Sequence, residues 1–231
     1  MIKGAIFDLD GTLYEYEAID KIAMNELEDY TCKLLSINSL DFNIAFKKGK
    51  VETKSILYDC AAQHNRLLYC QKTCENLGVS PAIYALDMYE VYWGTMLEHM
   101  KLNNGVMELF QRLKCRNIKT AICTDLTAHI QYRKIRKLGL EKYIDYIVTS
   151  EEIGIEKPSE KMFQACLTKL KLMPEETFYI GDSFKKDIIG ASRMGILTIW
   201  YNVNEEEVEA DGRAKYLNIN TFYDERLLSL C

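Results

Sequence analysis

Two aspartates stand almost side by side at the end of a short apolar run, in the stretch AIFDLDGTLY at residues 5–14. Asp8 and Asp10 flank Leu9, and two carboxylates this close repel each other unless a positive charge lies between them. Residues two apart on a strand point to the same side, so we expect both acids to face one site while Leu9 packs inward. The stretch predicts a charged site at the end of a buried strand.

Further polar residues follow the ends of later apolar runs. Thr124 and Asp125 close IKTAICTD, and Lys157 lies in IGIEKPS. Asp182 lies near the end of TFYIGDS, and Asp187 follows five residues later. Ligands of an open parallel sheet bind at the carboxyl ends of its strands. We therefore expect these side chains to meet the first two aspartates at one edge of a sheet.

The apolar pattern indicates which elements position these residues. Strands are expected at residues 2–8, 118–125, 145–150, 177–183 and 196–202. Helices are expected near residues 105–115, 127–138, 159–171 and 184–194, and the pattern from about 18 to 100 is helical throughout. Strands separated by single helices indicate right-handed βαβ units and a parallel sheet with helices on both faces. We predict an α/β fold, with a Rossmann-like three-layer core (residues 1–16 and 101–231) and an inserted all-helical domain (residues 17–100).

Four motifs in this order, FDLDGTLY, CTD, EKPS and GDSFKKD, resemble those of the haloacid dehalogenase superfamily. The helical insertion lies where that superfamily carries a type 1 cap, although the cap is matched only in position and helical character. The motifs cover the sheet, residues 1–14 and about 103–202. SEEIGIEKP and GDSFKKDIIGASRMGI look most like the branch that contains phosphoglycolate phosphatases and nucleotidases.

The resemblance implies a role for each acid. Mg²⁺, which prefers hard oxygen ligands, would be held by Asp8, the backbone carbonyl of Asp10, and Asp182, and would relieve the repulsion between the acids. Asp8 would attack phosphorus to form an aspartyl-phosphate. By analogy, Asp10 would protonate the leaving oxygen and then activate water.

The resemblance also implies roles for the residues around the acids. Thr124 and Lys157 would hold the phosphoryl oxygens, and Asp187 would orient Lys157 or a metal-bound water. Asp125 stands where asparagine is common in the family, so we expect different local hydrogen bonding without loss of activity. Substrate contacts are expected from Tyr14, Tyr16 and His129, although core packing explains most cap aromatics and a solvated role suits many histidines.

The predicted function is a Mg²⁺-dependent phosphatase for a small phosphorylated metabolite, such as a nucleoside monophosphate or a sugar phosphate. L-2-haloacid dehalogenases of the superfamily lack the second aspartate, so Asp10 favours phosphate chemistry. Phosphoglucomutase-like phosphoryl transfer, dehalogenation and a non-catalytic binding role are the alternatives. A calcium loop is disfavoured, because the twelfth position from Asp8 is Ile19 rather than glutamate.

The composition limits the class of protein, the partners and the cellular compartment that we expect. The chain has 231 residues, a formal net charge of −5 and 48% hydrophobic residues, which argues for a globular protein and against nucleic-acid or anionic-membrane partners. A membrane span and a signal peptide are both missing from the pattern, so we expect a cytoplasmic protein. The sequence leaves its oligomeric state open between a monomer and a homodimer. The 8 cysteines are expected to be reduced thiols. Helix packing is favoured over a zinc site for the group Cys60, His64, Cys70 and Cys74.

Overall fold

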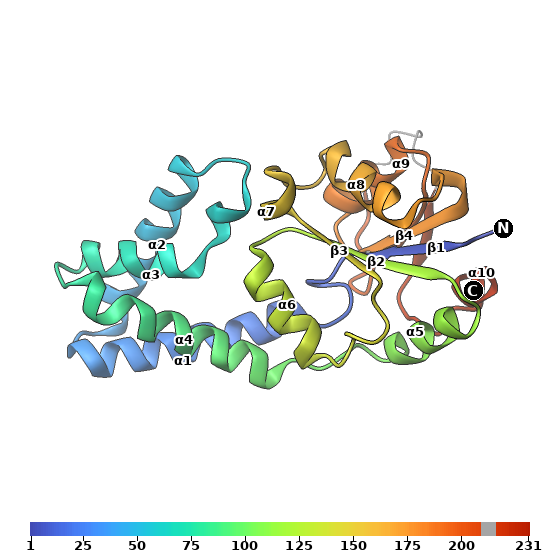
Figure 1. Cartoon of the computed structure of the whole chain (residues 1–231). Coiled ribbons are helices and arrows are strands. Elements are labelled where there is room, and N and C mark those ends of the chain that lie inside the picture. The colour runs from blue at the N-terminus through green and yellow to red at the C-terminus, as the bar shows by residue number, and fades with distance from the viewer. Residues whose placement is uncertain (209–215) are drawn as a thin grey trace. The chain divides into compact units, whose positions relative to one another are not determined.

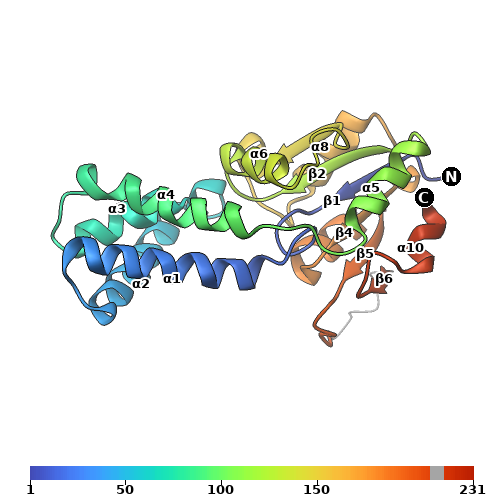
Figure 2. The same ribbon diagram turned by 90° about the horizontal axis from the view of Figure 1, so that it is seen from below.

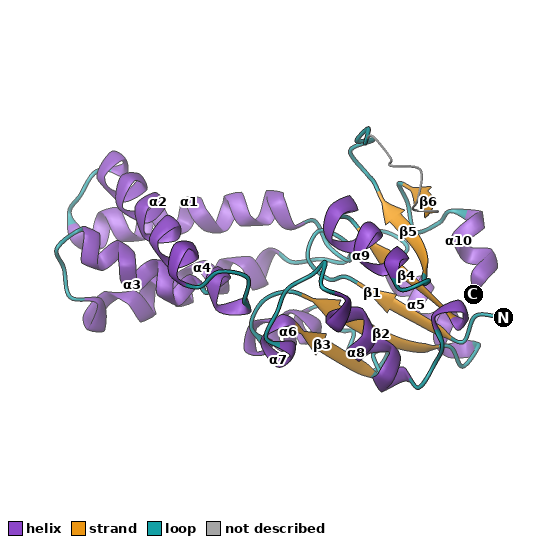
Figure 3. Ribbon diagram, turned by 90° about the horizontal axis from the view of Figure 1, so that it is seen from above, coloured by secondary structure: helices purple, strands orange, loops and turns teal. Residues whose placement is uncertain are grey.

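The computed structural model describes residues 1–208 and 216–231 and divides the chain into two compact units. One unit combines residues 1–15 with 101–231, and the other contains residues 16–100. All strands lie in the first unit, whereas the second unit contains helices and turns (Figure 3). The predicted α/β class with an inserted helical segment is confirmed.

The first unit is built on a six-stranded parallel sheet with the order β3-β2-β1-β4-β5-β6. Its strands are β1 (Gly4–Phe7), β2 (Lys119–Thr124), β3 (Tyr146–Thr149), β4 (Thr177–Gly181), β5 (Leu197–Tyr201) and β6 (Tyr216–Ile219). The first five match strands expected from the sequence. We did not predict β6, a four-residue strand at the edge of the sheet.

Strand β1 occupies the interior of the sheet, between β2 and β4. Gly4 is paired with Lys119 on one side and with Thr177 on the other. All four of its residues are buried, as expected for a strand covered on both faces. The chain leaves β1 at Asp8, so its acids emerge at the middle of the sheet's carboxyl edge.

Helices cover both faces of this sheet (Figures 1 and 2). Helices α8 (Glu160–Leu170) and α9 (Ile189–Arg193) pack on one face, where Phe163 and Cys166 contact a core that includes Tyr179 of β4. On the other face, the ring of Phe110 of α5 (Val106–Cys115) packs against that of Phe7, with 4.7 Å between the ring centroids. Within the described part of this unit, the other α-helices are α6 (Ala128–Lys137), α7 (Ser150–Ile153) and α10 (Glu225–Leu230).

The helix expected at residues 184–194 begins differently from an ordinary α-helix. It opens as a π-helical turn, Phe184–Ile188, and continues as α9. The side chain of Ser183 accepts a hydrogen bond from the Lys186 backbone N–H, and the Ser183 backbone N–H donates to Asp187 at 3.0 Å. The wide turn thereby returns Asp187 to the end of β4. Such turns occur often at functional sites.

The second unit consists of four helices around its own core. They are α1 (Tyr16–Leu35), α2 (Ser39–Ile56), α3 (Arg66–Asn76) and α4 (Pro81–His99), with a 3₁₀ turn at Ala61–His64. Pro81 opens α4 at a position where its missing N–H costs nothing. Cys70 and Cys74 are fully buried, and the Cys74 sulfur lies 3.7 Å from that of Met88. These two thiols therefore pack in the helical core.

Two further observations concern the state of the cysteines and the lengths of the helices. All eight cysteines are free thiols. Across residues 1–208 and 216–231, every helix is either too short or too polar to cross a bilayer.

Candidate active site

Three carboxylates gather at the carboxyl edge of the sheet. Asp8 follows β1, Asp182 follows β4, and Asp187 lies in the π-helical turn. Their oxygen atoms lie within 4.8 Å of one another, and Asp8 and Asp187 are almost fully buried. Oxygen donors at this spacing could hold a hard divalent cation.

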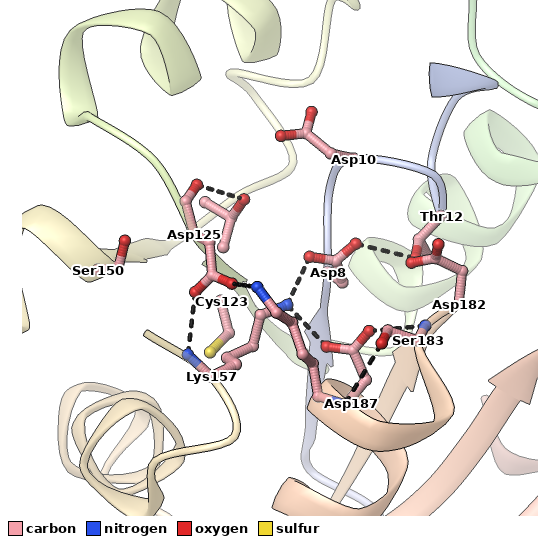
Figure 4. A network of polar contacts seen from close by, with 12 residues as sticks. Asp8, Asp10, Thr12, Cys123, Asp125, Ser150, Lys157, Asp182, Ser183 and Asp187 are labelled. Atoms are coloured by element: carbon pink, nitrogen blue, oxygen red, sulfur yellow. Dashed lines mark hydrogen bonds and ion pairs between the residues drawn. The ribbon is translucent and has the colours of Figure 1, made fainter. Parts of the chain in front are cut away.

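A buried lysine lies among these carboxylates (Figure 4). The Nζ atom of Lys157 lies 2.6 Å from an oxygen of Asp8 and 2.6 Å from an oxygen of Asp187. It also donates to the hydroxyl of Tyr179 at 3.2 Å. The side chain of Lys157 is 3% exposed, so its charge is compensated by the acids rather than by water. Burial would lower the pKa of Lys157, but Asp187 and Asp8 raise it well above its usual value.

The single ammonium group of Lys157 does not neutralise three carboxylates, and the pKa values of Asp8 and Asp182 are raised. Burial, together with the nearby Asp187 and Asp182, raises the pKa of Asp8 well above its usual range despite Lys157. Burial and Asp187 raise the pKa of Asp182 to about 6. The cluster therefore binds a proton more tightly than an ordinary aspartate does, and a further cation would compensate its remaining negative charge.

Thr12 and Gly11 shape the other side of the cluster. The hydroxyl of Thr12 lies 3.0 Å from both Asp8 and Asp182 and therefore links the ends of β1 and β4. Gly11 has a φ of +88°, and a Cβ atom there would lie 2.4 Å from an oxygen of Asp182. This position requires glycine for both conformation and space. Thr12 was not among the candidates from the sequence.

The residues that close β2 lie beside Lys157. One carboxylate oxygen of Asp125 accepts from the backbone N–H of Lys157 at 3.0 Å, and the other accepts from Lys186 at 2.8 Å. An asparagine side chain could not accept at both ends, so an aspartate suits these two donors. Thr124 is 1% exposed and its hydroxyl accepts from the side-chain amide of Gln131 at 2.6 Å.

Asp10 has a different set of partners from Asp8. Its carboxylate is directed away from those of Asp8 and Asp182 (Figure 4). Lys134 donates to its two oxygens at 2.6 and 2.8 Å, Gln131 donates at 3.0 Å, and the Tyr14 hydroxyl also donates. Burial alone would raise the pKa of Asp10, but Lys134 and these hydrogen bonds lower it. The side chain of Asp10 is therefore not part of the three-acid cluster.

The three expected substrate contacts lie in different surroundings. Tyr14 is fully buried, with its hydroxyl on Asp10. Tyr16 belongs to the helical unit, where its hydroxyl accepts from Arg66 at 2.7 Å. His129 is exposed in the first turn of α6. The structure thus brings only Tyr14 into the network around Asp10.

Sequence analysis missed Lys134, Gln131 and Tyr179 as well as Thr12. A signal for the first two is present in α6, where Ile130, Gln131, Lys134 and Ile135 are all buried. Positions i, i+1, i+4 and i+5 share one face of a helix. The apolar residues of α6 therefore place two polar residues on its inner face. Tyr179 gives no such signal, because a tyrosine is ordinary in a buried strand.

Comparison with known proteins points to one family. The model of haloacid dehalogenase-like hydrolases matches residues 5–201. A ribulose-1,5-bisphosphate 5-phosphatase of Halopiger xanaduensis is 33% identical over 208 residues, covering 89% of this chain and 87% of that protein. A glyceraldehyde 3-phosphate phosphatase of Methanopyrus kandleri is 28% identical over 200 residues, covering 86% of this chain and 83% of that protein.

The fold is shared with solved structures. The 2-haloacid dehalogenase of Pseudomonas syringae pv. Tomato matches with a TM-score of 0.80 and 22% identity, over 100% of this chain and 98% of that one. A likeness at this level of identity concerns the fold and leaves the reaction to be argued from the site.

Proposed function

Because this chain belongs to the haloacid dehalogenase-like hydrolase family, we propose that it is a Mg²⁺-dependent phosphatase that hydrolyses a small phosphorylated metabolite. The observation that carries this proposal is the buried cluster of Asp8, Asp182 and Asp187 around Lys157. The pairing of a nucleophilic carboxylate with a second aspartate, Asp10, favours phosphoryl transfer over dehalogenation.

The acid cluster fits Mg²⁺ by the chemistry of its donors. Asp8 and Asp182 would hold the ion with the backbone carbonyl of Asp10, and Asp187 would orient Lys157 from behind. Bound Mg²⁺ would neutralise the charge of the phosphoryl oxygens. The raised pKa values of Asp8 and Asp182 support a site that is completed by a cation.

The protein residues account for both half-reactions. A carboxylate oxygen of Asp8 attacks phosphorus, the P–O bond to the leaving oxygen breaks, and that oxygen takes a proton from Asp10. Asp10 must first bind a proton for this step, because its contacts with Lys134 favour the ionised form. The resulting aspartyl-phosphate is hydrolysed by a water whose proton returns to Asp10, which releases inorganic phosphate and restores Asp8. Two easier steps thus replace one difficult displacement.

Thr124 and Lys157 would bind the phosphoryl oxygens during these steps. Lys157 is already held at 2.6 Å from Asp8, so its charge lies where negative charge accumulates in the transition state. Asp125 fixes the backbone of Lys157 through the 3.0 Å hydrogen bond.

Among small metabolites, a sugar phosphate is the substrate class that the relatives favour. The two relatives described above are named for phosphates of ribulose and glyceraldehyde. We further propose that the helical unit selects the substrate, with Tyr16 as its candidate contact and His129 as a candidate from α6. A nucleoside monophosphate is the second class to be tested.

The proposal is tested with purified protein, Mg²⁺ and 4-nitrophenyl phosphate, beside Asp8→Asn. Phosphate release by the wild type alone supports it, and absence of turnover by the wild type over a broad range of pH and Mg²⁺ concentration overturns it. A panel of sugar phosphates, nucleotides, phosphoglycolate and 2-haloacids then distinguishes the substrate classes. Transfer of phosphate between two positions of a sugar, without release, would instead establish a mutase.

A further inference from the structure

Lys186, in the π-helical turn, is a cation beside the site that the mechanism above does not use. Its Nζ atom donates to Asp125 at 2.8 Å and to Glu156 at 3.4 Å. The side chains of Asp125 and Glu156 are 16% and 4% exposed, whereas that of Lys186 is 40% exposed. Largely buried carboxylates need a partner that compensates their charge, and these two share one ammonium group. We call Asp125, Glu156 and Lys186 the ion triad.

Each member of the ion triad is next in the sequence to a residue of the proposed site. The three pairs of neighbours are Thr124 with Asp125, Glu156 with Lys157, and Lys186 with Asp187. They lie at the end of β2, in the segment before α8, and in the π-helical turn. The ion triad therefore joins three segments that are separate in the sequence, at the positions beside their functional residues.

The ion triad also holds the backbone that carries Lys157. One oxygen of the Asp125 carboxylate accepts from the backbone N–H of Lys157 at 3.0 Å, and the other accepts from Lys186 (Figure 4). The position of Asp125 thus depends on the lysine at its far end. The Nζ atom of Lys157 lies 2.6 Å from Asp8, so a shift of this backbone would move the ammonium group relative to the proposed nucleophile.

We propose that Lys186 is a positioning residue for the phosphoryl-binding segments: through Asp125 and Glu156 it keeps Thr124 and Lys157 in register. This inference rests on the proposed phosphatase function. Without the ammonium group, the two carboxylates would repel each other and the segments that carry them would move apart. A displacement of about 1 Å that originates away from the reacting atoms can lower a rate about 10²-fold.

Residue 125 offers a test that separates positioning from direct contact with the substrate. An asparagine there is neutral, and its side-chain oxygen can still accept from the backbone N–H of Lys157. Asp125→Asn therefore removes the repulsion that loss of Lys186 would create. If Lys186 bound the substrate itself, this second change would not replace the lost contact.

The experiment measures kcat/KM on 4-nitrophenyl phosphate with Mg²⁺ for the wild type, Lys186→Met, Asp125→Asn and the double variant. We expect a fall of about 30-fold in Lys186→Met and of less than about threefold in Asp125→Asn. The double variant should recover to within about fivefold of the wild type, a coupling that independent changes do not show. Lys185→Met, an exposed lysine of the same π-helical turn, is the matched control and should leave kcat/KM unchanged.

A phosphate analogue provides a second measurement. Orthovanadate adopts the five-coordinate geometry of phosphoryl transfer, so its inhibition constant should rise in Lys186→Met by about the factor by which kcat/KM falls. The affinity for Mg²⁺, measured by calorimetry, should stay unchanged, because Asp8 and Asp182 are outside the ion triad. Lys186→Arg keeps the charge and should keep most of the activity. If Lys186→Met does not fold, the polar and neutral Lys186→Gln takes its place in the same comparison.

Three outcomes would count against this inference. A double variant no more active than Lys186→Met would overturn it, because the lysine would then act on the substrate directly or on packing alone. An affinity for Mg²⁺ that falls together with kcat/KM would also overturn it, since the loss would then extend beyond the phosphoryl-binding segments. A wild type without activity would defeat the proposed function itself, and this inference with it.

Discussion

Lys157 Nζ lies 2.6 Å from a carboxylate oxygen of Asp8, and both side chains are almost completely buried. The proposed nucleophile and its nearest cation are therefore paired before any substrate arrives. A phosphoryl group that approaches Asp8 meets this ammonium at once, and no solvent needs to reorganise around the charge it carries.

Replacing the nucleophile should separate activity from stability. We expect Asp8→Asn to lower kcat by at least about 10³-fold, because the amide cannot form the phosphorylated intermediate. The metal-free protein should not lose thermal stability, since the change removes one of three mutually repelling carboxylates. Steady-state kinetics and a thermal melt with EDTA measure the two effects. A melting temperature far below that of the wild type would contradict our account of the cluster.

Removing the lysine should have the opposite effect on stability. Lys157→Met leaves Asp8 and Asp187 buried without their shared cation, which we expect to cost about 3 kcal/mol of unfolding free energy in the absence of metal. Saturating Mg²⁺ should restore part of this loss. Urea denaturation with and without Mg²⁺ measures both. Lys185→Met, at an exposed position of the same π-helical turn, is the control and should change the unfolding free energy by less than about 0.5 kcal/mol.

Stability without metal should fall as the pH rises through the range in which Asp182 titrates. The pKa of Asp182 is about 6 in the folded protein, against 3.8 for an ordinary aspartate. A raised pKa means that the folded state binds the proton more tightly, so the stabilisation is complete below pH 3.8 and is lost as the pH rises through 6. The difference in unfolding free energy between the wild type and Asp182→Asn, measured from pH 4 to 7, isolates this group.

Mg²⁺ should reverse that trend. Binding requires the ionised carboxylate, so below pH 6 the affinity for Mg²⁺ should weaken by up to about tenfold per pH unit. Isothermal titration calorimetry between pH 5 and 7.5 measures the affinity directly. An affinity that does not change over this range would show that Asp182 is not a ligand.

Gly11 should be intolerant of a methyl group. Gly11→Ala places a Cβ atom 2.4 Å from an oxygen of Asp182 at a φ of +88°, so either the backbone or the carboxylate must move. We expect the affinity for Mg²⁺ to fall at least about tenfold and the unfolding free energy to fall by about 1–2 kcal/mol. Gly94→Ala, on the exposed side of α4 with open space around it, should instead stabilise the protein by up to about 1 kcal/mol.

Most of the fold could be predicted from the sequence, because each segment has an apolar pattern that agrees with the element it forms. Apolar runs bounded by glycine and charged residues correctly predicted β1 to β5, and the four motifs correctly predicted the family. β6 was missed because only four residues are paired and only Ile219 is fully buried, so the pattern is too short to be distinguished from a loop.

The cluster at the sheet edge was predictable for a different reason from the network around Asp10. Strand ends converge by topology, so Asp8, Lys157 and Asp182 could be placed together without knowledge of any rotamer. Asp10 follows the end of β1, where strand alternation no longer fixes the direction of a side chain. Its partner Lys134 lies among other basic residues in the sequence, so the sequence alone does not distinguish it from a solvent-exposed lysine.

The position of β1 also has a consequence for how the chain acquires its structure. This strand is synthesised long before its hydrogen-bonding neighbours, which begin at Lys119 and Thr177. Pairing between strands so far apart in the sequence slows folding, because the entropy cost of closing a long loop precedes the stabilising contacts. The apolar run GAIF cannot pair with either neighbour until the helical segment that follows it in the sequence has been synthesised. The stretch that carries the proposed nucleophile therefore completes its pairing only after β4 has been synthesised, so we expect activity to appear late in synthesis.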